Sequence, residues 1–455
     1  MFETIKNCFK VKEIRRKIWI TLLLLLIFRL GCYIPVPGID PAQFKEAIGS
    51  NSFLGILSSI TGGSLQNATL FALGISPYIN ASIIIQLLTV GIPALERLSK
   101  QGEEGRKKIA QITRYLTIAL AVAQAIGIIV SFAIRGGALR YEIFGVVPGS
   151  ALSEKAANWI AGIFLTVIYT AGAMLVMWIG ERITEYGISN GISMIIFIGI
   201  LSTAGLTIVD NLVDGFKGEY VRFWELLGFV ILTVIEFFAI VTVDLSERRI
   251  PVQYAKQVKG RKMYGGQSSV IPIKISGSGV MPLIFAFAFI TFPQMIISMF
   301  WPNSKANTNI TNWFSGSSPY WYGQLIYMVA LCLLIFAFAF FYSSMQFNPE
   351  DVSKTIQQNG GFIQGIRPGK PTALYLKRIN NRITLFGAIY LSLVAFIPSI
   401  LSMVIASLPL EGVPNLTLLS VFSTTGILIV VSVSLELEKQ MESQLMMKNY
   451  KGFLK

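Results

Sequence analysis

The chain alternates between long apolar runs and shorter polar or basic segments. An α-helix of about 20 apolar residues crosses the hydrocarbon core of a bilayer. Ten runs reach or approach this length, the first and the fifth being the shortest. We therefore predict an all-α, polytopic membrane protein with ten transmembrane helices, at residues 18–33, 74–92, 112–133, 159–179, 192–208, 224–243, 280–299, 322–341, 383–404 and 416–435.

The positive charges between these runs predict the orientation. Of the 38 Lys and Arg residues, 30 fall on the side that holds both chain ends, seven on the other side, and Arg29 lies within the first run. Membrane proteins concentrate Lys and Arg on the cytoplasmic side. Both termini are therefore expected in the cytoplasm, and we expect the basic first run to be retained rather than cleaved as a signal peptide. Contact with anionic lipid accounts for most of this charge.

Two runs at matching positions are interrupted by Gly and Pro. The run at 74–92 carries Gly74 and Pro77, and the run at 280–299 carries Pro282 and Pro293. Each is the second run of a five-run half, and such pairs are typical of internal repeats with a path between them. We predict two inverted halves, residues 1–210 and 211–455.

The stretch at 53–73, before the second run, is moderately apolar but broken by a Gly-Gly-Ser sequence and by Gln66 and Asn67. It is too polar to span a membrane. A short helix that folds back toward the membrane and a plain external loop both remain open, because irregular backbone at membrane depth needs protein or a water-filled cavity around it.

Two basic segments are longer than the loop that a simple pair of helices needs: residues 246–275 and 345–382. Long ordered loops are often functional. A docking surface for a cytoplasmic partner and a loop that lies against lipid are equally compatible with the charge.

The chain shows no sign of catalytic or cofactor chemistry. It has no His, and Cys8, Cys32 and Cys332 have no metal-site or disulfide-framework spacing. Phosphate-binding, zinc-protease and serine-hydrolase motifs are missing from the sequence. Arg29 lies near a run end, where it can snorkel to the interface, and Glu236 is the one acidic group well inside a run. We expect a protein that is not an enzyme and has no cofactor, and the scarcity of charges in the runs argues against a solute pump.

Several motifs, in order along the whole chain, resemble those of the SecY/Sec61-alpha family, whose members form the channel of the Sec translocon. They are RLG at 29–31, IPVPGI at 34–39, LGISPYINASII at 73–84, GEEGRKKI at 102–109, GISNGIS at 187–193, RRIPVQYA at 248–255 and GIRPG at 365–369.

The resemblance implies two inverted five-helix halves around an hourglass pore, narrowed at mid-membrane by apolar side chains. By motif match these side chains are Ile79, Ile83, Ile192, Ile196, Ile284 and Ile429. A narrow apolar collar offers no hydrogen bonds to ions and can gate by dewetting. Helices 2, 3, 7 and 8 are then expected to form a lateral gate, through which hydrophobic segments leave into lipid.

The resemblance also implies a plug, a short helix within residues 58–70 that seals the closed pore. Its expected residues are Ser59, Ile60, Thr61, Gly62, Gly63, Ser64, Leu65 and Gln66. Two glycines would supply pliability. Gln66 and Asn67 stand where the family often carries a charge, and the seventh run is unusually rich in Phe.

The basic segments are expected to dock the SecA ATPase and the ribosome, through Arg248, Arg249, Lys256, Lys259, Arg261, Lys262 and Arg367. The other partners that the resemblance implies are SecE, SecG, signal peptides and nascent secretory or membrane proteins. The chain itself is then expected in the bacterial plasma membrane. Two alternatives stay open: a secondary solute transporter, and an insertase scaffold without a through-pore.

Overall fold

The computed structural model describes residues 2–49, 58, 61–134, 137–140, 154–216, 220–254, 257–259, 262–264, 268–275, 279, 281–301, 304–314, 318, 320–407 and 424–452. The chain divides into two compact units. Unit 1 comprises Met1–Phe229, Ala288–Tyr327 and Leu410–Lys455, and unit 2 comprises Val230–Phe287 and Met328–Pro409. Three helices run from one unit into the other: α10 (Tyr220–Leu245), α11 (Met281–Phe300) and α13 (Trp321–Gln346).

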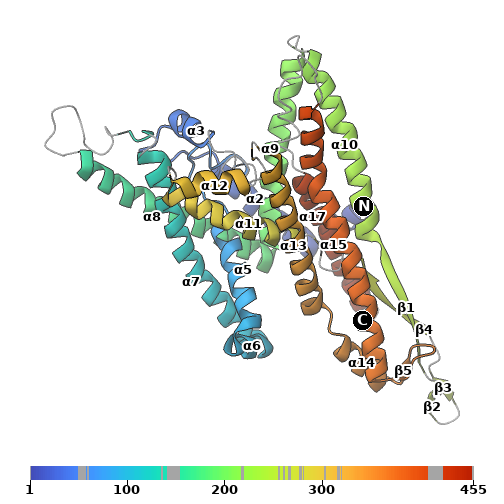
Figure 1. Ribbon diagram of the computed structural model, residues 1–455. Helices are drawn as coiled ribbons and strands as arrows, with labels where there is room; N and C mark the ends of the chain where they lie inside the picture. Colours follow the sequence, from blue (N-terminus) through green and yellow to red (C-terminus); the bar gives the residue numbers. More distant parts are fainter. Residues whose placement is uncertain are drawn as a thin grey trace. The chain divides into compact units, whose positions relative to one another are not determined.

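Unit 1 is built from helices (Figure 1). Within it α7 packs against α5 and α8, α8 packs against α2 and α9, and α9 packs against α17. Its further elements are α1 (Phe2–Lys10), α2 (Lys12–Gly31), α3 (Pro41–Gly49), α5 (Ser76–Gly91), α6 (Pro93–Lys100), α7 (Glu103–Ile128), the π-helical turn η1 (Ile129–Ile134), α8 (Glu154–Tyr186), α9 (Gly191–Phe216), α12 (Lys305–Trp313) and α17 (Thr424–Gly452).

The main core of unit 1 lies between α7, η1, α8 and the segment that precedes α5. Its small members, such as Ala121, Ala125 and Ala173, let the helices approach closely. Large side chains such as Leu165 and Tyr169 fill the remaining space. At the end of α5 the chain bends by 100° into α6, where Pro93 stands at the first position of the new helix.

Unit 2 combines helices with a small sheet. In it α13 and α15 (Lys370–Ser407) lie side by side, with α14 (Pro349–Gln358) between them in sequence (Figure 1). Asn348 caps α14 by accepting a hydrogen bond from the Glu350 amide at 3.1 Å. Pro349, Glu350 and Asp351 follow in the first turn, as a helix start favours.

The sheet of unit 2 has the order β4-β1-β5 and is antiparallel. The strands are β1 (Glu247–Tyr254), β4 (Ser268–Lys274) and β5 (Gly361–Phe362), and β2 (Gln257–Lys259) pairs separately with β3 (Lys262–Tyr264). Pro251 lies in β1 before the pairing with β5 begins at Gln253, so the missing N–H of the proline breaks no bond of that pair.

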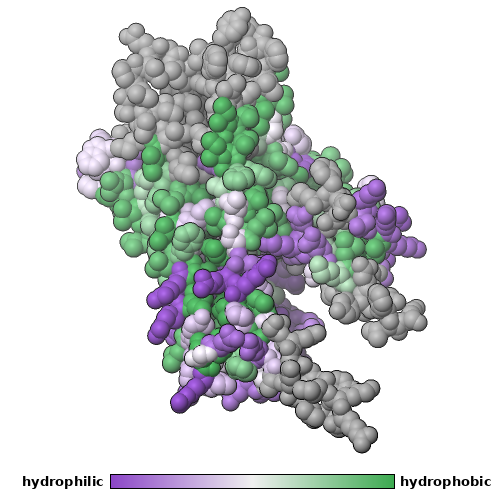
Figure 2. Space-filling model, turned by 90° about the vertical axis from the view of Figure 1, so that its right-hand side faces the viewer, coloured by the Kyte–Doolittle hydropathy of each residue, from purple (hydrophilic) through white to green (hydrophobic). Residues whose placement is uncertain are grey.

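The all-α prediction is therefore right for most of the chain and wrong for the first basic segment, which forms strands. Each of the ten predicted runs overlaps a helix. Within the described residues, four helices are long and apolar enough to cross a membrane, and the bent α5–α6 pair makes a fifth candidate. On the face that Figure 2 presents, hydrophobic residues form large patches and hydrophilic residues form smaller clusters.

Candidate functional site: a buried plug segment and a basic sheet

The segment before α5, here called the plug segment (residues 58 and 61–75), lies inside unit 1. Its described part consists of turns, apart from Ser58, which is helical, and a bridge at Thr69. Of the expected plug residues, Ser59 and Ile60 lie outside the described residues. Leu65 is fully buried and belongs to the main core of the unit. The described part of the segment is thus packed as a core element, which a plain external loop would not be.

Polar groups of the plug segment are satisfied largely within the segment itself. The hydroxyls of Thr61 and Ser64 donate to the carbonyls of Ser58 and Thr61, at 3.1 and 2.8 Å. The Thr69 hydroxyl donates to the Ser64 carbonyl at 3.1 Å, and the Gly63 amide donates to the Ser58 carbonyl at 2.8 Å. All four hydroxyl-bearing side chains are buried. Short hydroxyl side chains therefore replace the hydrogen bonds that a helix would supply.

The second part of the plug segment is tied to the stretch after α2. The Val36 amide donates to the Ala68 carbonyl at 3.0 Å, and the Leu70 amide donates to the Ile34 carbonyl at 2.9 Å. These two bonds flank the bridge between Pro35 and Thr69. The IPVPG motif thus serves as a short strand partner that anchors one end of the segment.

Glycines of three helices form the seat of the plug segment. A Cβ on Gly31 of α2 would collide with the Phe71 ring, and one on Gly172 of α8 would collide with the Leu70 carbonyl. Phe71 also stacks on Phe28, with 5.8 Å between the ring centroids. Gly199 of α9 lies against Gly62. Small residues allow this close backbone approach, so the seat is shaped for an irregular chain segment.

Gly62 and Gly63 begin the described turns with φ values of 71° and 82°, a left-handed conformation that favours glycine. Beside Gly62 lies the guanidinium of Arg29, from the last turn of α2. Its Nη2 donates to the Ser202 hydroxyl of α9 and, at 3.4 Å, to the Tyr33 hydroxyl. We expected Arg29 to snorkel to the membrane interface. In the structure it points toward α9 and the plug segment.

The six predicted pore residues lie on four helices. Ile79 and Ile83 are one turn apart on α5, and Ile192 and Ile196 are one turn apart on α9, so each pair shares a helix face. Ile429 lies on α17, which packs against α9. These five belong to unit 1, whereas Ile284 on α11 belongs to unit 2, and their closure into one ring stays a prediction.

The two basic segments come together in unit 2, in what we call the sheet platform (β1, β4, β5 and α14). β5 from the second segment pairs with β1 from the first through Gln253–Phe362 and Tyr254–Gly361. Beneath the strands lies a core that includes Ile250, Val252 and Leu376. The predicted docking residues Arg248 and Arg249 are exposed at the start of β1.

Arg367 is exposed in the loop between β5 and α15. This loop is held in place at three points. Ile366 packs on the platform core, the Thr372 hydroxyl donates to the Arg367 carbonyl at 2.9 Å, and the buried Ser353 hydroxyl donates to the Gly369 carbonyl at 2.7 Å. The arginine is therefore presented on a fixed loop that belongs to the same unit as β1.

The remaining docking residues are less fully described. Lys259 and Lys262 face each other in the β2–β3 pair, whereas Lys256 and Arg261 lie outside the described residues. In the platform, Arg249 donates to the Glu247 carboxylate at 2.7 Å. The Arg249 side chain is 73% exposed and the Glu247 side chain 30%, so solvent and salt weaken this ion pair.

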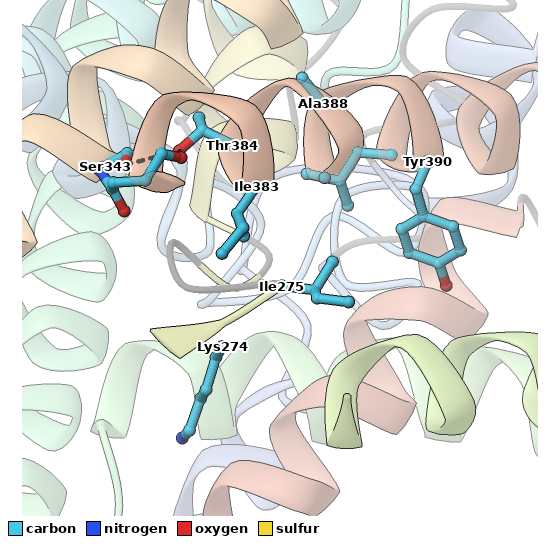
Figure 3. Close-up of a pocket in the computed structure, with 10 residues that line it drawn as sticks. Lys274, Ile275, Ser343, Ile383, Thr384, Ala388 and Tyr390 are labelled. Carbon is cyan, nitrogen blue, oxygen red and sulfur yellow. Dashed lines mark hydrogen bonds between the residues drawn. The ribbon is translucent and has the colours of Figure 1, made fainter. Parts of the chain in front are cut away.

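A small cavity of about 20 Å³ lies between α13, α15 and the end of β4 (Figure 3). The Ser343 and Thr384 hydroxyls are 2.7 Å apart across it, and the Asn380 amide donates to Ser343 at 2.7 Å. The Lys274 side chain extends away from this pair (Figure 3). Such a volume holds one water molecule and no organic solute, so we assign it to helix packing.

Glu236 of α10 is buried in the same unit.

Two features of the site escaped the sequence reasoning. Gly31, Gly172 and Gly199 are ordinary glycines of apolar runs, with nothing in their spacing that marks a seat. Ser202 is an ordinary polar residue of its run, and only the structure pairs it with Arg29. The one available signal was Arg29 itself, a charge inside an apolar run.

Comparison with known proteins gives a consistent picture. The family model SecY matches residues 69–437. The protein translocase subunit SecY of Streptomyces griseus is 40% identical, over 100% of both chains. A solved SecY structure, whose plug domain is described as stabilising the closed state of the channel and maintaining a membrane seal, has a TM-score of 0.62 at 20% identity. It covers 94% of this chain and 92% of that one.

A second solved structure, canine Sec61 in a ribosome–channel complex from the endoplasmic reticulum, gives a TM-score of 0.61 at 19% identity, with the same two coverages. At these identities the two structures establish the fold. Family membership is established by the family model and by the full-length relative. The chain belongs to the SecY family.

Proposed function

We propose that this chain is a passive protein-conducting channel, which passes unfolded secretory polypeptides across the cytoplasmic membrane and releases hydrophobic segments sideways into lipid. The plug segment carries this proposal. Irregular backbone at membrane depth is stable only inside protein or beside a water-filled cavity. Because most of its described hydrogen bonds are its own, the segment can leave its seat and expose few unpaired groups. A removable stopper needs this property.

The proposed pore waist consists of the six isoleucines named above. Branched aliphatic side chains hold back ions by dewetting and bind no passing side chain strongly. The proposed frame is ten transmembrane helices in two inverted halves, 1–210 and 211–455. The overlap of every predicted run with a helix supports that count.

The proposed setting is the bacterial plasma membrane, with both termini in the cytoplasm. The bias of 30 of the 38 Lys and Arg residues to one side supports this orientation. The similarity to the Streptomyces protein supports the bacterial setting. In this orientation the sheet platform faces the cytoplasm.

The proposed partners on that face are the SecA motor and the ribosome, and in the membrane SecE and SecG. The platform supports docking, because it fixes Arg248, Arg249 and Arg367 on one folded unit. A rigid basic surface suits the acidic patches of a protein or the phosphates of ribosomal RNA. The ribosome in the complex of the similar canine channel supports the second partner.

Reconstitution tests the proposed function. The chain is placed in lipid vesicles with its two membrane subunits, the motor ATPase, ATP and a secretory precursor. We expect the precursor to become protected from external protease inside the vesicles. Arg367→Glu is expected to lower this yield by roughly tenfold, since it places a repulsive charge in the docking surface. Lys305→Glu, an exposed position on α12 outside both basic segments, is the control for added charge and is expected to keep full transport.

The alternatives predict other outcomes. Insertion of hydrophobic segments with no lumenal precursor would indicate an insertase scaffold. Uptake of a small solute against its gradient, without precursor transport, would indicate a secondary transporter. Either result contradicts the proposed channel.

A further inference from the structure

Arg29 connects two helices on either side of the plug segment. Its Nη2 donates to the Ser202 hydroxyl of α9, while the side chain itself belongs to α2. The Tyr33 ring steadies it from the α2 side, with Cζ of the arginine 5.5 Å from the ring centroid. A cation over an aromatic face is attracted by the ring quadrupole. The guanidinium is thus held in one orientation.

The other terminal nitrogen of Arg29 faces the plug segment. A Cβ placed on Gly62 would collide with Nη1, and the same position is 3.3 Å from the Cα of Gly199. Gly62 is therefore enclosed by the arginine on one side and by α9 on the other. Its φ of 71° also favours glycine. A larger residue would fit neither the space nor the backbone.

This arrangement is costly for the fold. Nη1 is buried and makes no hydrogen bond within the described residues. Among the described residues, no ion pair joins Arg29 to a carboxylate. The side chain as a whole is half-buried, but a charged group with a buried donor that makes no hydrogen bond generally destabilises a protein, and an apolar side chain of similar length would avoid that cost. Stability alone does not explain an arginine here, whereas contact with a movable segment does.

The geometry points to Arg29 as the latch that keeps the plug segment in its seat while the channel is closed. The inference rests on the proposed function and adds a residue and a contact to it. The anchored end of the segment, at residues 68–70, is tied to the stretch after α2. Arg29 covers the other part of the segment at Gly62, which, like Gly63, has a positive φ. Release of the latch frees the glycine end first, while the anchored end keeps the segment attached.

The test compares Arg29→Met with the wild-type complex in sealed vesicles. Methionine keeps length and apolar contact and removes the charge and the donors. We expect the resting ion conductance to rise by roughly tenfold, since hydrogen bonds to charged groups are the stronger kind. The thermal unfolding midpoint is expected to stay the same or rise, because a buried donor without a partner has been removed. A residue with a merely structural role would lower the midpoint instead.

Two further variants separate the parts of the latch. Ser202→Ala removes the acceptor on α9 and is expected to raise the conductance by a smaller factor. Arg29→Lys keeps a charge able to reach Ser202 and is expected to restore most of the seal. Arg182→Met is the matched control. Arg182 also stacks on aromatic rings, those of Trp178 and Tyr186, and its hydrogen bonds go to Glu185 and Tyr186 of the same helix. Its removal is expected to leave the conductance unchanged.

Each outcome decides the inference. Tight vesicles with folded Arg29→Met protein would overturn the latch, and so would a leak that appears only together with a lowered unfolding midpoint. If wild-type complexes transport the precursor while Arg29→Met does not leak, the latch alone fails. If wild-type complexes transport nothing and a loosened plug segment conducts no ions, the proposed function fails as well.

Discussion

The plug segment of unit 1 and the sheet platform of unit 2 are the two main irregular or stranded regions that the structure describes. Both must satisfy backbone groups without an α-helix. The plug segment does so with its own hydroxyls and with two bonds to the stretch after α2. The platform does so with a continuous antiparallel ladder between β1 and β4, from Glu247–Lys274 to Gln253–Ser268.

Under the proposed function, this difference separates the part that must move from the part that must stay in place. Few of the described bonds join the plug segment to the rest of unit 1, so displacing it breaks little besides apolar packing. Unpairing β1 breaks a whole ladder and opens a core. The proposed function thus places the contacts that must break in the proposed pore and the contacts that must last in the proposed docking surface. Variants in the two regions should therefore affect different functions.

The largest expected effect is that of Val252→Asp in the platform. Val252 is 0% exposed, at the centre of the platform core. A carboxylate buried there without a partner costs more than about 3 kcal/mol of folding free energy. We expect a loss of this size to unfold the small sheet. We expect protease cleavage within residues 247–274 and loss of motor and ribosome binding, measured by limited proteolysis and co-sedimentation.

The control for Val252→Asp is Ser269→Asp, on the paired strand and exposed. It adds the same charge and is expected to keep the platform folded. The resting ion conductance is expected to be unchanged in both variants. A leak in Val252→Asp vesicles would show that the two regions are not separable, and would contradict the comparison.

A smaller effect is expected from Leu65→Ala in the plug segment. Leu65 is 0% exposed and belongs to the core of unit 1. Truncating its side chain to alanine costs about 2–5 kcal/mol in a rigid core. Part of that cost is lost packing between the plug segment and its seat. We expect a raised resting ion conductance, measured across vesicles, with motor binding unchanged.

Asn67→Ala is the matched control, because Asn67 belongs to the same segment and is exposed. It is expected to keep the vesicles sealed. Reduced motor binding by Leu65→Ala would contradict the separation of the two regions. Equal conductance in both variants would show that burial of Leu65 does not hold the segment in place.

The sequence predicted the helices well, because apolar runs of membrane length have few alternative structures. Each predicted run overlaps a helix, and the irregular character of the stretch before α5 was visible in its glycines and polar residues. The family motifs then predicted a plug there, which stays a prediction. Local patterns were enough for the helices and for the irregular stretch.

The sheet platform was not predicted, for a physical reason. Its strand β5 is two residues long and pairs with β1 across more than 100 positions of sequence. Such a pairing leaves no local pattern, and two prolines in β1 and β4 argue against strands. The seat glycines and the contact between Arg29 and Ser202 are also long-range features. Sequence reasoning placed Arg29 near the end of its run and expected it to snorkel to the interface, so it named no partner for it.

The smallest expected effect tests how charge acts on the platform. Glu247→Gln removes the carboxylate that pairs at 2.7 Å with the largely exposed Arg249. Stability is expected to change by less than about 0.5 kcal/mol, as for most exposed ion pairs. Arg249 then becomes free for an acidic or phosphate partner, so binding of the motor or ribosome should tighten by roughly twofold at low salt. Titrations at rising salt should abolish the gain, since the Debye length falls to about 3 Å at 1 M. Weaker binding would mean that Arg249 acts through its pairing with Glu247, and that β1 presents Arg248 alone.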